Sequence, residues 1–135
     1  MSGSVRPRVL IVEDNPGDVF LFQECVRDRD VEVEVVVANE VDEGIRLLGP
    51  GQGPLPCLAL IDLHMPKRDG KHLLTHLREH PELAAIPVVV LSSSNRPTDR
   101  EACLQLGARD FLTKPSDWNG YCALIAGLRG YWSSI

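Results

Sequence analysis

The sequence lacks several features that would place it in a specialised class of protein. Its longest apolar runs, such as Pro87–Leu91, fall far short of the ~20 residues that a membrane-spanning helix needs. Its first residues lack the apolar centre of a secretory signal. It has no cluster of lysine or arginine, and its formal net charge is −5. We therefore expect a cytoplasmic protein that binds neither nucleic acid nor a membrane surface.

The cysteines do not form the pattern of a metal site or a disulfide framework. Cys25, Cys57, Cys103 and Cys122 are far apart in the sequence, and none belongs to the CxxC pair of a zinc ribbon. Without a secretory signal, a fold stabilised by disulfides is not expected. We interpret all four as small buried side chains of a protein in a reducing compartment.

What is present is typical of one ordinary globular domain. Hydrophobic residues make up 44% of the 135 residues and charged residues 24%, which excludes a disordered chain or a fibre. This length fits one core of usual size. We therefore expect residues 1–135 to form a single domain, with a core from about residue 8 to about residue 130.

Short apolar runs that are rich in β-branched residues predict five strands. They are Arg8–Val12, Val31–Val37, Cys57–Ile61, Pro87–Leu91 and Asp110–Leu112. The second run alternates valine with glutamate, which predicts a strand with one wet face at or next to a sheet edge. The first, third and fourth runs are apolar throughout, as is typical of strands that are buried on both faces of a parallel sheet.

Segments with a helical period lie between and after these runs. The first begins at Asn15-Pro16, where asparagine can cap a helix and proline costs no hydrogen bond. Its apolar residues Val19, Phe20, Phe22 and Val26 are predicted to share one face. The other four predicted helices are Glu40–Leu48, Lys71–Arg78, Thr98–Leu106 and Asn119–Arg129.

This alternation of strands and helices predicts an α/β fold, a doubly wound (βα)5 arrangement. Right-handed crossovers then give an open parallel sheet with helices on both faces, in three layers. Reactive groups of such sheets gather outside the carboxyl ends of the strands. The residues that directly follow each predicted strand are therefore the candidates for function.

Charged and hydroxyl side chains follow four of the five predicted strands. They are Glu13 and Asp14, Asp62, Ser92, and Lys114. Crowded carboxylates repel one another, and their oxygen atoms suit a hard cation such as Mg²⁺. With a cation present, Asp62 can attack phosphorus, while Lys114 and the serine hydroxyl meet the charge of the phosphoryl group. The set therefore predicts phosphoryl transfer to an aspartate.

Each of these residues also has an ordinary structural interpretation. A carboxylate at a strand end often caps a helix, a serine there often forms a turn, and a lysine is usually solvated. These interpretations do not explain why all of them coincide at one edge of the sheet. The coincidence favours the functional interpretation.

Four longer motifs resemble the receiver domain of two-component response regulators. They are VLIVED at residues 9–14, IDLHMPKRDG at 61–70, IPVVVLSSS at 86–94 and GARDFLTKP at 107–115. The similarity extends from Val9 to about Leu128. It implies a flavodoxin-like sheet with the strand order 2-1-3-4-5.

The resemblance assigns a role to each of the charged and hydroxyl residues that follow the predicted strands. Asp62 is implied to be the phosphoacceptor, and Mg²⁺ or another divalent cation such as Mn²⁺ to be the cofactor. The implied metal ligands are Glu13, Asp14, Asp62 and the backbone carbonyl of His64. Glu13 replaces the commoner aspartate, and its length allows binding through water. His64 is less usual at its position and bears on how fast the phosphoryl group hydrolyses.

Four further residues are implied to sense the phosphoryl group or to support the site. Ser92 corresponds to the hydroxyl switch residue and Lys114 to the phosphate-sensing lysine. Phe111 corresponds to an aromatic residue whose rotamer reports activation, although plain core packing is its alternative. Pro115 corresponds to a proline that follows a cis peptide bond, an isomer that the sequence alone does not determine.

The resemblance also implies how the protein signals. The chain ends soon after the last predicted helix, so we expect a single-domain response regulator rather than an enzyme. A sensor histidine kinase is implied as phosphodonor and an unidentified protein as downstream partner. The loop before the third strand, the IPVVVLSSS run and the C-terminal GYWSSI are most similar to receivers that are paired with bacterial phytochrome kinases. The face of the fourth helix, fifth strand and fifth helix is a candidate homodimer interface, with Trp132 near it.

Some alternatives remain open at this point. A Mg²⁺-dependent phosphohydrolase with an aspartate nucleophile is the second function, although such enzymes place an acid where His64 stands. A binding module that is never phosphorylated and a flavodoxin-like carrier are less consistent with the acidic residues that follow the predicted strands. His72, His76 and His80 are spaced to form one helical stripe. This stripe is solvated, contacts a partner kinase or, through a pair at i, i+4, chelates a metal. Tyr131 and Trp132 either anchor an interface or fold back on the core.

Overall fold

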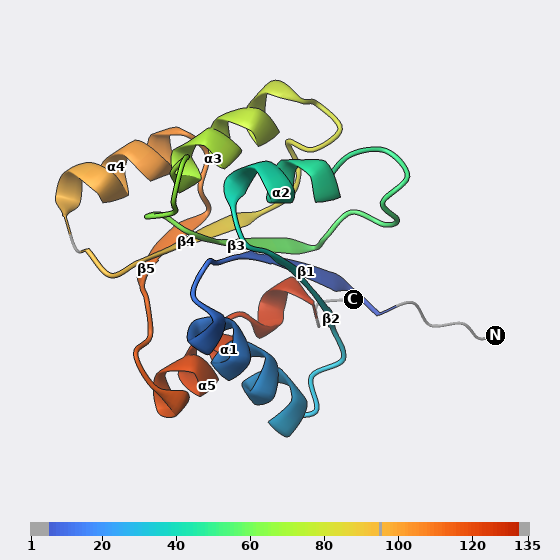
Figure 1. Cartoon of the computed structure of the whole chain (residues 1–135), viewed down its shortest axis with the longest axis vertical. Helices are drawn as coiled ribbons and strands as arrows, with labels where there is room; N and C mark the ends of the chain where they lie inside the picture. Colours follow the sequence, from blue (N-terminus) through green and yellow to red (C-terminus); the bar gives the residue numbers. More distant parts are fainter. Residues whose placement is uncertain (1–5, 95, 133–135) are drawn as a thin grey trace.

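A computed structural model describes residues 6–94 and 96–132 and shows a parallel sheet between two layers of helices (Figure 1). The strands are β1 (Arg8–Val12), β2 (Glu34–Ala38), β3 (Leu58–Asp62), β4 (Val88–Ser92) and β5 (Asp110–Thr113). Their order in the sheet is β2-β1-β3-β4-β5, and all neighbouring strands are parallel. The predicted flavodoxin-like α/β fold is therefore confirmed.

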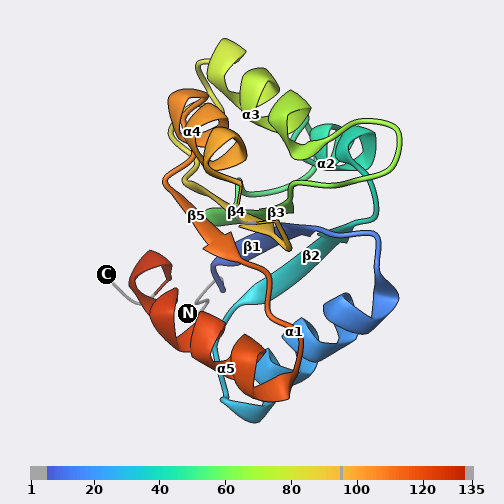
Figure 2. The ribbon, with the colours of Figure 1, turned by 90° about the vertical axis from the view of Figure 1, so that its left-hand side faces the viewer.

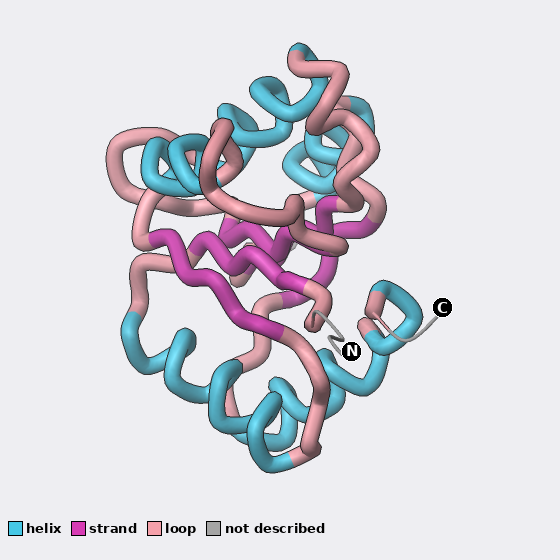
Figure 3. The backbone as a smooth tube through the Cα atoms, turned by 90° about the vertical axis from the view of Figure 1, so that its right-hand side faces the viewer, coloured by secondary structure: helices cyan, strands magenta, loops and turns pink. Residues whose placement is uncertain are grey.

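Within the described residues, five helices and one short 3₁₀ turn cover the sheet. They are α1 (Pro16–Asp28), α2 (Val41–Leu47), α3 (Gly70–Glu79), α4 (Pro97–Gln105), α5 (Trp118–Gly127) and η1 (Arg129–Tyr131). Helices α2, α3 and α4 lie on one face, and α1 and α5 lie on the other (Figures 2 and 3). Within the described ranges, no helix has the length and apolar character that a membrane span requires.

Alternation along the central strands builds two separate cores. In β1, Leu10 and Val12 pack in the core beneath α2, α3 and α4, whereas Val9 and Ile11 pack in the core beneath α1 and α5. Strands β3 and β4 alternate in the same way because successive side chains of a strand point to opposite faces. Both faces of these strands are buried, which explains their continuous apolar sequences.

Strand β2 lies at the sheet edge, as its sequence indicates, but it begins at Glu34 rather than at the predicted Val31. The residues before it close helix α1 instead. Asp30 has a positive φ of 56°, and the Val31 amide donates to the Val26 carbonyl. The valine-rich pattern therefore begins in a connection, where the Val31 amide bonds to the helix and the Val33 amide to the Val31 carbonyl rather than to the sheet.

The predicted apolar face of the first helix is wrong at one position. Phe20 is 60% exposed, while Phe22, Cys25 and Val26 form the buried side of α1. Residues 20 and 22 are separated by about 200° around a helix, so they cannot share a narrow face. The buried residues follow the i, i+3, i+4 spacing that a helix on a sheet requires.

The four cysteines are all free, and three of them are buried as predicted, whereas Cys57 is half-buried. Cys25 of α1 and Cys122 of α5 place their sulfur atoms 3.2 Å apart. Burial and the hydrogen bond with Cys122 raise the pKa of the Cys25 thiol to about 12. This contact is part of the close packing between α1 and α5.

Candidate functional site

Three carboxylates meet at the carboxyl ends of β1 and β3. Glu13 and Asp14 directly follow β1, and Asp62 is the last residue of β3. One carboxylate oxygen from each lies within 4.8 Å of the others. Glu13 and Asp62 are 2% and 6% exposed, whereas Asp14 is open to solvent. Residues that are far apart in the sequence thus form one small group of oxygen atoms.

Lys114 brings a positive charge to this group. It follows β5 directly, and its backbone amide donates to the Ser92 carbonyl at 2.9 Å, which continues the pairing of β5 with β4. Its Nζ atom lies 2.8 Å from Glu13 Oε1 and 3.0 Å from Asp62 Oδ2. Lys114 therefore bridges two of the three grouped carboxylates.

The surroundings shift the protonation of both partners of this contact. Burial raises the pKa of Glu13 to about 7, although hydrogen bonds from Lys114 and from the Asn15 amide lower it in part. Burial also opposes the charge of Lys114, but hydrogen bonds to Glu13, Asp62 and Asp18 outweigh it and raise the lysine pKa above its ordinary value. Lys114 thus stays charged, while Glu13 is poised between its two forms near neutral pH.

A fourth carboxylate, Asp18, reaches the site from helix α1. The Asn15 side chain caps this helix by accepting from the amides of Gly17 and Asp18, as the Asn15-Pro16 pair predicts. Asp18 Oδ2 lies 3.0 Å from Lys114 Nζ, and Asp18 Oδ1 accepts a hydrogen bond from the Tyr121 hydroxyl at 3.1 Å. Our sequence analysis missed Asp18, because an acid in a first helical turn is also common for its interaction with the helix dipole.

Ser92 and Phe111 lie on the other face of the sheet. Phe111 is 6% exposed and belongs to the core beneath α2, α3 and α4. Ser92 pairs in register with Thr113 and is fully buried, and its hydroxyl accepts from the Ser94 amide at 3.0 Å. By strand alternation, Ser92 falls on the same face as Val88 and Val90, whereas Asp62 falls on the opposite face.

The sequence profile of the response regulator receiver domain matches residues 9–126. The chain belongs to the response regulator receiver family. It is 31% identical over 129 residues to the response regulator Rcp1 of Synechocystis sp., a match that covers 92% of this chain and 87% of Rcp1. It is 36% identical over 116 residues to the two-component response regulator ORR11 of Oryza sativa, covering 85% of this chain and 76% of that protein.

Solved receiver structures agree with this assignment. The phosphorylated cyanobacterial phytochrome response regulator RcpA is 31% identical and superposes with a TM-score of 0.86, covering 97% of both chains. The Mn²⁺-bound form of Rcp1 is 28% identical, with a TM-score of 0.81 and 96% of both chains covered. The bacteriophytochrome response regulator AtBRR is 33% identical, with a TM-score of 0.75 and 97% of both chains covered.

Two further predicted residues of the receiver site are placed by the structure as follows. The His64 amide donates to Asp62 Oδ1 at 3.2 Å, so this residue orients the carboxylate through its backbone. The cis isomer that the resemblance implies before Pro115 is not present: the described ranges contain no cis peptide bond, so the Lys114–Pro115 bond is trans. Trans is the favoured isomer of such bonds, and local sequence does not override it.

Among the described residues, the three histidines of the stripe do not come together as a group that could hold a metal ion. His80 caps the end of α3, and its ring lies 4.1 Å from the ring of His76, while His72 is exposed. His80 Nδ1 is hydrogen-bonded to the His76 carbonyl at 2.7 Å. In the part of the chain that the structure describes, the acidic group of Glu13, Asp14 and Asp62 is the one cluster suited to an ion.

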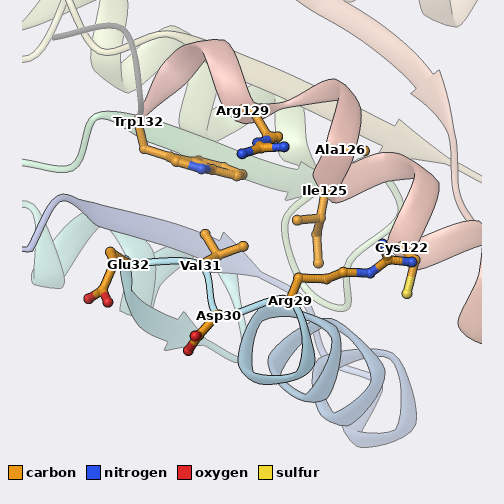
Figure 4. A pocket seen from close by; sticks show the side chains of 9 residues that line it. All are labelled: Arg29, Asp30, Val31, Glu32, Cys122, Ile125, Ala126, Arg129 and Trp132. Carbon is orange, nitrogen blue, oxygen red and sulfur yellow. The ribbon is translucent and has the colours of Figure 1, made fainter.

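The C-terminal aromatic residues fold back on the core. Trp132 is 8% exposed and packs in the core beneath α1 and α5. It lies beside a pocket of about 440 Å³ between α5 and the connection from α1 to β2, and Figure 4 shows its indole turned toward Val31. The last three residues of the GYWSSI motif lie outside the described residues. Trp132 therefore does not supply the exposed interface anchor that was one of its two alternatives.

Proposed function

We propose that this receiver, as a single domain over residues 1–135, is a phosphoacceptor switch rather than an enzyme. Asp62 accepts a phosphoryl group from a histidine of a sensor kinase. The observation that carries the proposal is the arrangement of Asp62. One of its oxygen atoms is bound by the His64 amide and the other by Lys114, within a group of three carboxylates.

The acidic group fits a divalent cation such as Mg²⁺ or Mn²⁺. Its three carboxylates offer hard oxygen ligands within 4.8 Å of one another, and one of them is open to solvent. Glu13, Asp14, Asp62 and the His64 carbonyl are the proposed ligands. When bound, such an ion neutralises negative charge on the transferring phosphoryl group. The similar protein Rcp1 has a Mn²⁺-bound form, which supports this assignment.

Two side chains at the ends of the strands, Asp62 and Lys114, take part in the transfer. An oxygen of Asp62 forms a bond to phosphorus while the bond from phosphorus to the histidine nitrogen of the kinase breaks. The electron pair returns to the imidazole, and the product is an aspartyl phosphate. Lys114, which stays charged beside Asp62, stabilises the negative charge of the phosphoryl oxygens.

Ser92 and Phe111 then convert the new charge into a change of shape. They lie on the same face of the sheet and near its exposed β5 edge. We propose that the Ser92 hydroxyl moves toward the phosphoryl group and that Phe111 repacks with it. Such a step shifts the population between two arrangements of the α4–β5–α5 face. This face is the proposed surface for an unidentified downstream protein or for a second copy of the chain.

The proposed phosphodonor is a sensor histidine kinase of the phytochrome type in the cytoplasm. This part of the proposal rests on the relatives, since RcpA is a cyanobacterial phytochrome response regulator and AtBRR is a bacteriophytochrome response regulator. Both superpose on nearly the whole of this chain. Phosphotransfer from a purified phytochrome kinase, compared with an unrelated histidine kinase, tests the pairing.

The Asp62→Asn variant provides the test of the phosphoacceptor. Wild-type protein treated with acetyl phosphate and Mg²⁺ is expected to gain one phosphoryl group by intact mass, and Asp62→Asn is expected to gain none. Asp28→Asn is a matched control, because Asp28 is an exposed carboxylate at the far end of α1. Undiminished phosphorylation of Asp62→Asn would contradict the assignment. Rapid turnover of a sugar phosphate by the wild type would favour the phosphohydrolase instead.

A further inference from the structure

Lys114 contacts two of the carboxylates that a divalent cation would also use. Its ammonium lies 2.8 Å from Glu13 Oε1 and 3.0 Å from Asp62 Oδ2, and both carboxylates belong to the group of three. Two positive charges held by the same pair of carboxylates repel each other strongly in a half-buried site. Lys114 must therefore give up at least one of these contacts when the carboxylates turn toward an ion.

Among the described residues, Asp18 is the one partner of the lysine ammonium that lies outside the group of three. Asp18 Oδ2 is 3.0 Å from Lys114 Nζ, and the two side chains are 18% and 15% exposed. A lysine that left the acidic group without another partner would keep a poorly solvated charge, which is costly. The Asp18 contact offers this partner with no change in the position of the backbone.

Asp18 is itself held from the opposite side. Its Oδ1 atom accepts from the hydroxyl of Tyr121, a residue of α5 that is 1% exposed. The backbone around Asp18 is fixed by the Asn15 cap at the start of α1. A buried hydroxyl and a helix cap thus restrict the Asp18 carboxylate to the side of the site where it meets Lys114.

We propose that Asp18 is a positioning residue that retains Lys114 when Glu13 and Asp62 engage a divalent cation. Tyr121 keeps Asp18 in place for this purpose. The lysine then remains beside Asp62, ready to meet a phosphoryl oxygen, without competing for the oxygen atoms of the ion. The inference rests on the proposed function, because it takes the acidic group as the cation site.

Two simpler roles for Asp18 make different predictions. If Asp18 only adds negative charge, its removal weakens cation binding by the same factor whether or not Lys114 is present. If Asp18 only links α1 to α5, its removal lowers stability without a specific effect on cation binding. The proposal instead requires that the effect of Asp18 on the cation depends on Lys114 and on the Tyr121 hydroxyl.

The test measures Mn²⁺ binding by the full chain through the electron paramagnetic resonance signal of the unbound ion, with Mg²⁺ calorimetry as a second measurement. Asp18→Asn keeps the shape of the side chain and is expected to weaken Mn²⁺ binding about tenfold. Tyr121→Phe, which changes no charge, is expected to weaken it about threefold, and Lys114→Gln to tighten it. In the Lys114→Gln background, Asp18→Asn is expected to have an effect of about twofold or less.

The outcomes separate the inference from the proposed function. Equal losses on Asp18→Asn in both backgrounds would overturn the inference, and so would unchanged binding in Tyr121→Phe. If Asp18→Asn does not fold, as judged by circular dichroism, Tyr121→Phe decides the matter, because it retains every charge. Wild-type protein that binds no Mn²⁺ would overturn the cation site and the inference together. Normal binding in both the wild type and Asp18→Asn would overturn the inference alone. Asp28→Asn again serves as the control.

Discussion

The two faces of the sheet carry different parts of the candidate site. Asp62 points to the face of α1 and α5, where Lys114, Asp18 and Tyr121 form a continuous network of charges and hydrogen bonds. The other face, beneath α2, α3 and α4, carries Phe111, and Ser92 falls on it by strand alternation. The difference follows from strand alternation, which sends neighbouring residues of one strand end to opposite sides.

The groups on the two faces would therefore have different roles. The face of α1 and α5 holds the groups that would bind the ion and meet the phosphoryl charge. The opposite face holds the groups that would repack and report on it. The two sets come within reach of each other at the carboxyl ends of the strands, where Asp62 pairs in register with Leu91, the neighbour of Ser92. Changes to the sheet ends should therefore affect both sets, whereas changes deep in one core should not.

The largest expected effect comes from truncating Trp132, which is buried far from the acidic group. Trp132→Ala is expected to lower the free energy of unfolding by about 3 kcal/mol, because it leaves a cavity in the core beneath α1 and α5. Urea denaturation measures this loss. Mn²⁺ affinity of the folded variant should be unchanged. A large change in Mn²⁺ affinity would show that this core controls the site. It would contradict the expectation that changes deep in one core leave the site unaffected.

A smaller effect is expected where α3 approaches the end of β3. A Cβ atom on Gly70 would lie 2.9 Å from Ile61 Cγ2 and 3.2 Å from the Asp62 carbonyl oxygen. Gly70→Ala should therefore cost about 1–2 kcal/mol of stability, because the neighbouring backbone must shift. It should also slow phosphorylation of Asp62 by acetyl phosphate.

Gly127→Ala is the matched control for this change. A Cβ atom at Gly127, at the end of α5, would meet nothing within 4 Å. Gly127→Ala is expected to leave the free energy of unfolding unchanged or to raise it slightly, because alanine favours the helix over glycine by about 0.5–1 kcal/mol. If Asp62 were phosphorylated as fast in Gly70→Ala as in Gly127→Ala, the end of β3 would be insensitive to the packing of α3 on the opposite face. That result would contradict the expectation that changes at the sheet ends affect both sets of groups.

A further expected effect, of at most about 3 kcal/mol, is a dependence of stability on pH that comes from Glu13. Its pKa is about 7 in the folded protein, against 4.5 as the ordinary value. The unfolded chain therefore loses its proton first as pH rises, so ionisation of Glu13 favours unfolding between about pH 4.5 and pH 7. Without divalent cations, wild-type stability should fall over this range relative to Glu13→Gln. Parallel curves from urea denaturation would contradict the raised pKa.

Much of the fold and part of the site could be predicted from local patterns. The continuous apolar runs and the alternating edge strand reveal the sheet order once the family resemblance is added, and the Asn15-Pro16 pair marks the start of α1. The residues that follow each strand identify Glu13, Asp14, Asp62 and Lys114, because parallel strands deliver their carboxyl ends to one edge. The start of β2 was misplaced, because valines in a connection have the same pattern as valines in a strand.

The sequence by itself determined where the strands end and which charged residues stand there, because periodicity and the right-handed crossover are local rules. The tertiary structure alone decided that Asp18 and Tyr121, which are 103 residues apart, share a hydrogen bond beside Lys114. It also decided that Trp132 turns inward and that the bond before Pro115 is trans. These outcomes depend on how α1 and α5 pack against each other on one face, and no pattern within either helix specifies that contact.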